Sequence, residues 1–324
     1  MRDIWGRDIQ YLRISLTDRC NMRCQYCMPE AIPRVGHEEI LRYEEILLIC
    51  QAALQLGINR FKITGGEPLV RKEALSFMQA LRQLKGINSM TLTTNGLLLP
   101  PYLPAMKSLP VDAINISLDT LNASQFQQIA GVDGMHHVLQ AIRQSVKDGI
   151  PTKINAVLLH QTRNQLLPLA RLAEDMPVAV RFIEMMPIGY GVQQLGYTAD
   201  EALTVLHSAY PDLKAAWERR GNGPAVYYTS EKLQGCIGII AANTHAFCKQ
   251  CNRVRLTSTG FLKLCLCYQD GIDLKKIIRT TGSTNVLESL RQAMYQAIRQ
   301  KPIEHCFRDA EQVTEVKTMN QIGG

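Results

Sequence analysis

The chain has 324 residues, with 36 basic and 29 acidic side chains and a formal net charge of +7, and this length suits one large domain or two moderate ones. The basic excess suits an anionic ligand, but it is not gathered into the polybasic runs typical of nucleic-acid-binding proteins. The N-terminus lacks the apolar core of a signal peptide and no apolar run reaches membrane-spanning length, so we expect a soluble, cytoplasmic protein. In a reducing compartment, ten cysteines indicate metal binding or catalysis rather than disulfides.

Strand-like and helical runs alternate over the first part of the chain. The predicted strands are Tyr11–Thr17, Arg60–Thr64, Ser89–Asn95, Ala113–Asp119, Thr152–Leu159 and Ala179–Met186. The predicted helices are Tyr43–Leu56, Lys72–Leu84, Met135–Lys147 and Asn164–Glu174. This alternation is typical of a parallel sheet with helical crossovers, and its extent favours an α/β fold of the incomplete (β/α)6, TIM-like barrel type.

Several of these strands alternate polar and apolar side chains. Arg13 and Ser15 alternate with leucine and isoleucine, and Lys62 and Ser117 lie in the same kind of pattern. Because crossover helices cover the apolar faces, the polar faces should point inward. We therefore expect the barrel interior to be wet or to hold a polar ligand.

The pattern changes after about residue 190, where glycine-rich loops precede shorter elements. The predicted strands are Ala225–Thr229, Ile237–Ala241, Arg253–Thr257 and Phe261–Leu266, with a hairpin turn at 258–260, and the predicted helices are Asp273–Arg279 and Val286–Gln300. The sequence thus predicts two domains, 1–190 and 191–324, the second of them an α+β domain.

A short cysteine motif follows the first predicted strand. Cys20, Cys24 and Cys27 have the spacing Cys-x3-Cys-x2-Cys, and Tyr26 precedes the last cysteine. A closed zinc site would need a fourth protein ligand, which is not found nearby. The simplest interpretation is a [4Fe–4S] cluster with one iron left open for a small molecule, although a zinc knuckle or a redox-active cysteine pair is an alternative.

The motif resembles that of the radical S-adenosylmethionine (SAM) superfamily. The resemblance implies that SAM chelates the open iron and that its reductive cleavage yields a 5′-deoxyadenosyl radical. It also implies that the glycine-rich turn at 65–66, after the second strand, contacts the SAM amino group. By position, the SAM-binding residues would be Tyr26, Gly66, Ser117 and Met186.

A second cysteine set lies in the C-terminal part. Cys248, Cys251 and Cys265 have the spacing Cys-x2-Cys-x13-Cys, with Cys267 close by. Four thiols of this kind also occur in zinc ribbons. The arginines after Cys251 point instead to an anionic ligand beside the metal.

The run from Cys248 to Leu266 and the C-terminal Gly323-Gly324 resemble the GTP 3′,8-cyclase family of molybdenum cofactor biosynthesis. The resemblance extends over essentially the whole chain. It implies a second [4Fe–4S] cluster on Cys248, Cys251 and Cys265, whose open iron binds guanine, and abstraction of the ribose 3′-hydrogen of GTP to give 3′,8-cyclo-7,8-dihydro-GTP. The other four cysteines, Cys50, Cys236, Cys267 and Cys306, have no role in the family.

Further site residues follow from the same resemblance. The catalytic residues would be Arg253, Arg255, Gly323 and Gly324, and the GTP-binding residues would be Arg13, Lys62, Thr93, Lys153, Arg181, Arg253, Val254 and Arg255. Lys62 departs from the arginine we expect there, which keeps the charge but loses the bidentate fork.

The resemblance also implies partners: GTP as substrate, an unidentified electron donor, a downstream cyclic pyranopterin monophosphate synthase and a possible homodimer, with no nucleic acid or membrane involved. Two alternatives stay open. One is another radical SAM enzyme with an auxiliary cluster, such as a peptide-modifying maturase. The other is a non-enzymatic metal- or nucleic-acid-binding protein, in which metal analysis would find zinc.

Overall fold

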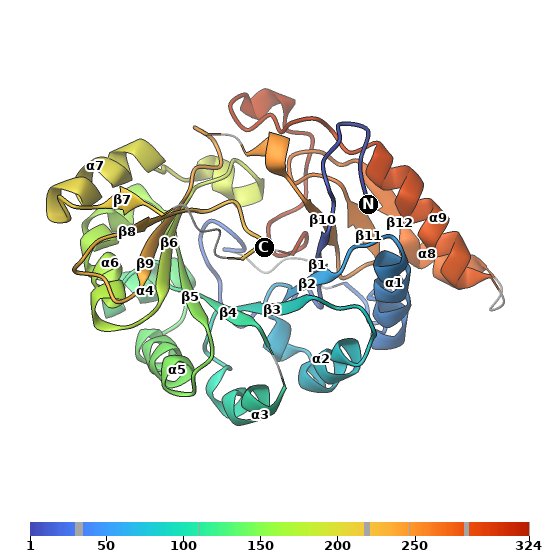
Figure 1. Ribbon diagram of the computed structural model, residues 1–324, viewed down its shortest axis with the longest axis horizontal. Helices are drawn as coiled ribbons and strands as arrows, with labels where there is room; N and C mark the ends of the chain where they lie inside the picture. The colour runs from blue at the N-terminus through green and yellow to red at the C-terminus, as the bar shows by residue number, and fades with distance from the viewer. Residues whose placement is uncertain (30–34, 110, 217–220, 246, 282–284, 324) are drawn as a thin grey trace. The chain divides into compact units, whose positions relative to one another are not determined.

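The computed structural model describes residues 1–29, 35–109, 111–216, 221–245, 247–281 and 285–323 (Figure 1). The chain forms two compact units, each made from separate stretches. The first comprises Met1–Asn21, Glu30–Leu92 and Cys248–Gly324, and the second comprises Met22–Pro29 and Thr93–Phe247. Because these units are defined by packing rather than by continuity along the chain, the domain boundary expected near residue 190 stays a prediction.

The first unit contains a sheet whose central strands are parallel. Its strands are β1 (Tyr11–Ser15), β2 (Arg60–Thr64), β3 (Ser89–Thr94), β10 (Arg253–Leu256), β11 (Phe261–Lys263) and β12 (Gly271–Asp273). β1 pairs in parallel with β2 on one side and with β10 on the other, and β2 pairs with β3. β11 and β12 extend the sheet in antiparallel fashion. The expected turn at 258–260 joins β10 to β11, and Gly260 adopts φ +88° there.

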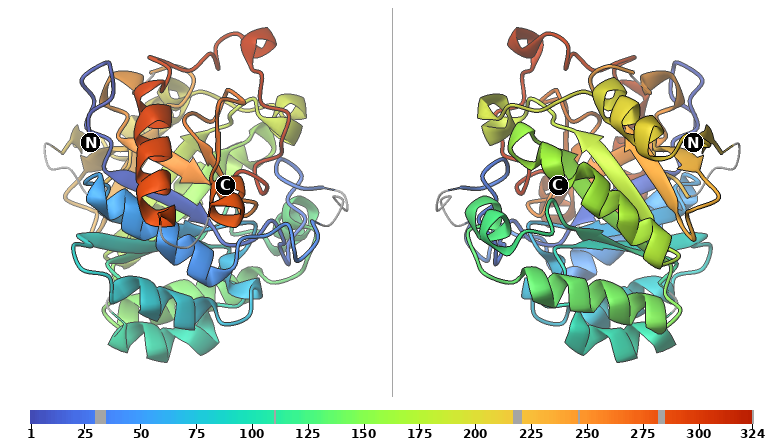
Figure 2. Two further views of the ribbon diagram at one scale, coloured as in Figure 1. Left: turned by 90° about the vertical axis from the view of Figure 1, so that its right-hand side faces the viewer. Right: turned by 90° about the vertical axis from the view of Figure 1, so that its left-hand side faces the viewer.

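Helices and short turns complete this unit. They are α1 (Tyr43–Gln55), α2 (Ala74–Arg82), α8 (Leu274–Thr280), α9 (Val286–Arg299) and the 3-10 turns Pro68–Val70, Cys248–Gln250 and Ala310–Gln312. α9 runs beside α1, although the two are far apart in the sequence (Figures 1 and 2). α1 buries Ile46, Ile49 and Ala53 completely, at the spacing of one helix face.

A buried glutamate links α1 to α8. The Glu45 carboxylate accepts hydrogen bonds from the Arg42 backbone N–H at 2.7 Å and from Nε and Nη2 of Arg279 at 3.0 and 3.2 Å. Burial alone would raise the pKa of Glu45, but the Arg279 hydrogen bonds and the Arg42 N–H outweigh it and hold the pKa below its ordinary value.

Replacing Glu45 by glutamine should lower the free energy of unfolding by about 1–3 kcal/mol near neutral pH, because the charged form is the one these donors stabilise. A depressed folded-state pKa gives stability that is present above the ordinary glutamate pKa of about 4.3 and is lost as pH falls below it. The difference between parent and variant in urea unfolding should therefore shrink in acid. The control is Glu288→Gln on α9, whose arginine partner is exposed to solvent and whose loss should matter little. Equal effects at both positions would contradict the role of Glu45.

The strands of the second unit are also mostly parallel. The strands β4 (Ala113–Ser117), β5 (Thr152–Leu158), β6 (Ala179–Glu184) and β9 (Cys236–Ile240) pair in parallel in that order. β8 (Val226–Thr229) and β7 (Lys214–Ala215) follow in antiparallel pairing. The helices are α3 (Leu103–Ser108), α4 (Ala123–Ala130), α5 (Met135–Lys147), α6 (Leu166–Asp175) and α7 (Ala199–Ala209), with 3-10 turns at Pro100–Tyr102, His160–Gln165 and Gly189–Gln193.

The sequence predictions for regular structure are largely confirmed. All six N-terminal strands begin where expected, and five of them end one or two residues earlier. Helices α3, α4 and α7 were not predicted. α4 carries a signal that could have found it, since the Asn122 side chain caps the Gln125 N–H and Gly131 ends the helix at φ +70°. Among the described residues, every helix is too short or too polar to span a bilayer.

Candidate active site

The first cysteine motif lies in the loop after β1. All three thiols, of Cys20, Cys24 and Cys27, lie outside any disulfide bond and are half-buried. The Cys24 carbonyl accepts the backbone N–H groups of Cys27 and Met28 at 2.9 and 2.8 Å, which closes a tight turn. Partly exposed thiols on a short loop are accessible to an iron–sulfur cluster, so the residues present fit that group.

Tyr26 is anchored by a residue that sequence analysis did not single out. Its hydroxyl donates to Asp119 Oδ2 at 2.8 Å, and Asp119 Oδ1 accepts the Val157 N–H at 2.8 Å. Burial, and then the negative charge of Asp119, raise the pKa of Tyr26. The Tyr26 phenol therefore stays protonated. Its hydrogen bond to the Asp119 carboxylate fixes the ring of a residue that lies between Cys24 and Cys27 in the sequence.

The two glycines after β2 are required by close packing within the first unit. A Cβ on Gly65 would come within 2.6 Å of the Thr17 carbonyl oxygen, and one on Gly66 within 2.4 Å of the Arg19 carbonyl oxygen. The Gly66 N–H also donates to Thr17 at 2.7 Å. The glycines thus let this turn pack against the segment that leads to Cys20, and the expected contact of the turn with SAM stays a prediction.

Three cations of the first unit stand in register on adjacent strands. Arg13 on β1 is the register partner of Arg255 on β10 and of Lys62 on β2. The Arg255 side chain is buried, and burial, followed by the charges of Arg13 and Arg253, holds the pKa of its guanidinium well below the usual value. Like charges in register repel one another, so this row favours an anionic ligand.

The C-terminal tail folds back onto the same strands. Arg255 Nη1 donates to the Gly323 carbonyl oxygen at 2.8 Å. Gly323 adopts φ +79°, and a Cβ there would lie 3.0 Å from Ser15 Cβ and 3.4 Å from Thr64 Cγ2. Asn320 reinforces the arrangement by donating to the Asp18 carbonyl oxygen at 2.9 Å. Gly324, the other tail residue singled out by sequence, lies outside the described residues.

Within the second unit, a second polar group contains the other predicted cations. Lys153 on β5 is half-buried and its Nζ lies 3.3 Å from the Tyr227 hydroxyl. Arg181 on β6 is buried, and its Nη2 donates to Asn115 Oδ1 at 2.5 Å. Asn115 in turn donates to Thr93 Oγ1 at 3.5 Å. Arg181 and Thr93 are therefore linked through Asn115, and Lys153 contacts Tyr227. Sequence analysis missed Tyr227 and the amide role of Asn115.

A glycine makes room for Arg181. Gly238 on β9 is its register partner, and a Cβ there would lie 2.8 Å from Arg181 Cγ. Of the remaining predicted residues, Ser117 ends β4 and is half-buried, and Met186 follows β6. Val254 is 1% exposed, which leaves its backbone rather than its side chain to contact a ligand.

The second cysteine set lies near the β10 and β11 ends. A 3-10 turn begins at Cys248, and the Cys248 carbonyl oxygen accepts the Cys251 N–H at 3.1 Å. Cys265 lies two residues after the end of β11. Among the described residues, no three metal-binding side chains converge on one point that could hold a single ion. A cubane does not need such convergence, because each cysteine binds a different iron.

Cys267 contacts a thiol outside this set. Its Sγ lies 2.9 Å from Cys306 Sγ and accepts the Cys306 N–H at 3.0 Å. The Cys267 thiol also hydrogen-bonds to Cys265, which lowers the pKa of Cys265 and raises that of Cys267. Cys267 therefore stays a thiol that supports the Cys265 thiolate.

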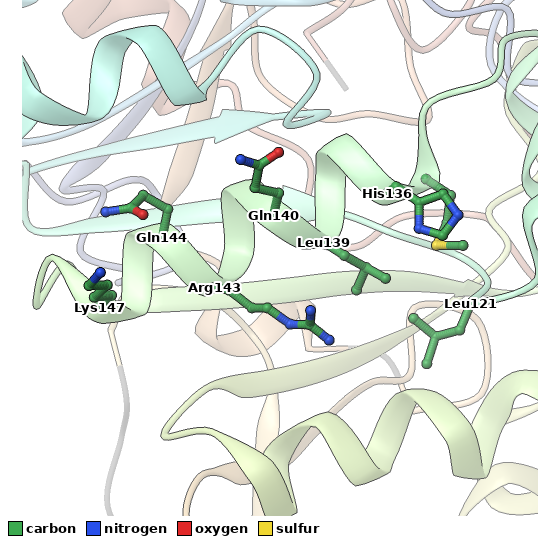
Figure 3. Close-up of a pocket in the computed structure, with 8 residues that line it drawn as sticks. Leu121, His136, Leu139, Gln140, Arg143, Gln144 and Lys147 are labelled. Atoms are coloured by element: carbon green, nitrogen blue, oxygen red, sulfur yellow. The ribbon is translucent and has the colours of Figure 1, made fainter.

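A surface hollow of about 480 Å³ runs along α5 (Figure 3). Its lining includes His136, Gln140, Arg143 and Lys147, which project from one face of the helix. None of the predicted site residues lines it. The shape of this surface thus does not identify the site, which is defined instead by the cysteines and by the cations on the strands.

Two family models together match most of the chain. The model of the radical SAM superfamily matches residues 14–173, and the model described as Molybdenum Cofactor Synthesis C matches residues 178–307. Among solved structures, Streptococcus suis SuiB bound to S-adenosylmethionine is similar, with a TM-score of 0.62 and 16% identity over 90% of this chain and 68% of SuiB. That likeness concerns the fold alone. The fold and the first cysteine motif define a radical SAM enzyme.

Similarity to curated proteins identifies the family within this class of enzymes. The GTP 3′,8-cyclase of Clostridium perfringens strain 13 is 37% identical over 100% of both chains, and that of Heliobacterium modesticaldum is 39% identical over 100% of both chains. The chain belongs to the GTP 3′,8-cyclase family. Its cofactors are accordingly SAM and a [4Fe–4S] cluster, with the additional C-terminal cluster of that family.

Proposed function

We propose that the chain converts GTP to 3′,8-cyclo-7,8-dihydro-GTP, the first step of molybdenum cofactor biosynthesis. Its full-length similarity to GTP 3′,8-cyclases supports this activity. The main structural support for this activity is the row of Arg13, Lys62 and Arg255, in which Arg13 is the register partner of the other two on adjacent strands. A triphosphate offers the negative charge that such a row requires.

In this proposal the first cluster is held by Cys20, Cys24 and Cys27, with SAM contacted by Tyr26, Gly66, Ser117 and Met186. When bound, the cluster and SAM would supply the radical chemistry needed to abstract the ribose 3′-hydrogen. Asp119 keeps the Tyr26 ring in place through its 2.8 Å hydrogen bond.

The proposed substrate-binding residues form two groups. In the first unit, Arg13, Lys62, Arg253, Arg255 and the Val254 backbone would bind GTP. In the second, the group would be Thr93, Lys153 and Arg181. Arg181 Nε is buried and has no hydrogen-bond partner among the described residues, which suits a bound anion. Arg253, Arg255, Gly323 and Gly324 would act as the catalytic residues by orienting the substrate.

The second cluster would be held by Cys248, Cys251 and Cys265, and its open iron would bind guanine. An electron donor, a downstream cyclic pyranopterin monophosphate synthase and a homodimeric partner complete the proposal. The activity is tested by incubating the anaerobically reconstituted protein with SAM, GTP and a reductant, and by mass spectrometry of the product. Formation of 5′-deoxyadenosine without a cyclised nucleotide would count against GTP as the substrate.

Lys153→Ala and Arg255→Ala should impair use of GTP more than cleavage of SAM. A charge-assisted contact contributes about 1.5–3 kcal/mol, so the KM for GTP should rise by about 10- to 100-fold. Arg255→Lys should recover part of the loss, because it keeps the charge but not the planar fork. The measurement is product formation against GTP concentration, with 5′-deoxyadenosine followed in parallel.

The control is Lys232→Ala, which removes an exposed lysine of the second unit. Its kinetics should match those of the parent. If the dependence on GTP concentration is unchanged in both test variants, Lys153 and Arg255 do not bind the substrate.

A further inference from the structure

A buried lysine lies beside the second cysteine set. Lys301, just after α9, is 3% exposed, and its Nζ donates to the carbonyl oxygen of Leu264, which precedes Cys265. Lys263, the other deeply buried lysine here, forms an ion pair with Glu315. Among the described residues, no carboxylate forms such a pair with Lys301. A buried ammonium group is costly unless an anion offsets it, so Lys301 requires a different anionic partner.

The second cysteine set lies beside this ammonium group. Lys301 Nζ donates to the carbonyl oxygen of the residue that directly precedes Cys265. The backbone N–H of His305, four residues after Lys301, donates to Cys248 Sγ at 3.4 Å. Cys248 is buried and Cys265 is half-buried, so thiolates there are poorly screened from the ammonium charge. The cysteines are therefore the anionic partner that these contacts bring to Lys301.

The N-terminal segment fixes the backbone at Lys301. Trp5 Nε1 donates to the Lys301 carbonyl oxygen at 2.9 Å. Arg7, itself buried and paired with Asp3 at 2.6 Å, donates to the carbonyl oxygens of residues 302 and 303 at 2.7 and 2.8 Å. The same guanidinium donates to the Cys248 carbonyl oxygen at 3.1 Å. Arg7 thus ties the loop that carries Cys248 to the segment that carries Lys301.

We propose that Lys301 is a positioning residue for the second [4Fe–4S] cluster, whose ammonium group balances the cysteine thiolates and raises the reduction potential of the cluster. The inference rests on the assignment of that cluster to Cys248, Cys251 and Cys265. Its physical reason is that a fixed positive charge in a poorly solvated site stabilises the added electron. The role concerns charge, so a residue of similar volume without charge cannot replace Lys301.

The test uses the full chain with Cys24→Ala, so that only the second cluster is reconstituted. The potential of the cluster is measured by anaerobic redox titration monitored by electron paramagnetic resonance. Lys301→Gln should lower the potential, and Lys301→Arg should restore most of the parent value. Lys276→Gln, which removes an exposed lysine from α8, serves as the matched control and should leave the potential unchanged.

Each outcome bears on the proposal. An unchanged potential in Lys301→Gln, or a potential equally low in Lys301→Arg, would overturn it, since packing rather than charge would then be responsible. If Lys301→Gln does not retain the cluster, retention by Lys301→Arg supports the charge and loss from both contradicts it. If the Cys24→Ala parent binds no iron, the assignment of the second cluster fails, and that failure is visible before any lysine variant is compared.

Discussion

Cys24→Ala should abolish the cleavage of SAM, because two cysteines cannot hold a cubane that needs three protein ligands and an open iron. Cys251→Ala should leave the first cluster in place and allow SAM cleavage to continue, but no cyclised nucleotide should form. The anaerobically reconstituted parent should contain about eight irons per chain, and each variant should contain about four. Iron and sulfide analysis together with 5′-deoxyadenosine formation measures these outcomes.

The matched control is Cys50→Ala, which removes a buried thiol of α1 that belongs to neither cysteine set. It should keep the full iron content, although the lost packing will lower stability somewhat. Zinc at the second site, or a full loss of SAM cleavage in Cys251→Ala, would contradict the division of the six cysteines into two independent sets.

Changes at the C-terminal tail should give the second large effect. Gly323→Ala introduces a Cβ 3.0 Å from Ser15 Cβ at a position with φ +79°, where a side chain costs about 1–2 kcal/mol in backbone energy alone. The tail should then move, and the 2.8 Å hydrogen bond from Arg255 should be lost. We expect cyclisation to fall by about tenfold or more, while SAM cleavage continues uncoupled. Deletion of Gly323 and Gly324 should have a larger effect and leave both clusters intact.

Gly6→Ala separates the effect of contact from that of backbone strain. Gly6 has φ +77°, close to the value at Gly323, but a Cβ there meets no atom within 4 Å. Its replacement should affect stability modestly and activity little. Parent-level synthesis of the cyclised nucleotide by the truncated chain would show that the tail plays no part in the reaction.

Local patterns were sufficient for most of the regular structure. The alternation of Arg13, Ser15 and Lys62 with aliphatic residues marked strands because side chains point to opposite faces with a period of two. The helix at Met135–Lys147 was predicted with its observed bounds, since its apolar residues recur at helical spacing. The six-residue α3 was missed because it is too short to show such a repeat.

These local patterns could not predict contacts between residues that are far apart in the sequence. β10 was expected in a separate C-terminal domain, yet it pairs with β1 and brings Arg255 into register with Arg13. Strand pairing over such a separation depends on the packing of both segments, and no local signal encodes it. The hydrogen bond from Tyr26 to Asp119 and the space that Gly238 leaves for Arg181 were not predicted, for the same reason.

The sequence by itself determined the chemistry that this protein can perform, because cysteine spacing within a loop of a few residues limits which metal groups the thiols can bind. It also determined the strand and helix order, which follows from local periodicity. Only the tertiary structure decided which residues meet: Arg255 with Gly323, Lys301 with the backbone beside Cys265, and Cys267 with Cys306. Electrostatic and packing energies depend on distance in space rather than along the chain, so these partnerships exist only once the chain has folded.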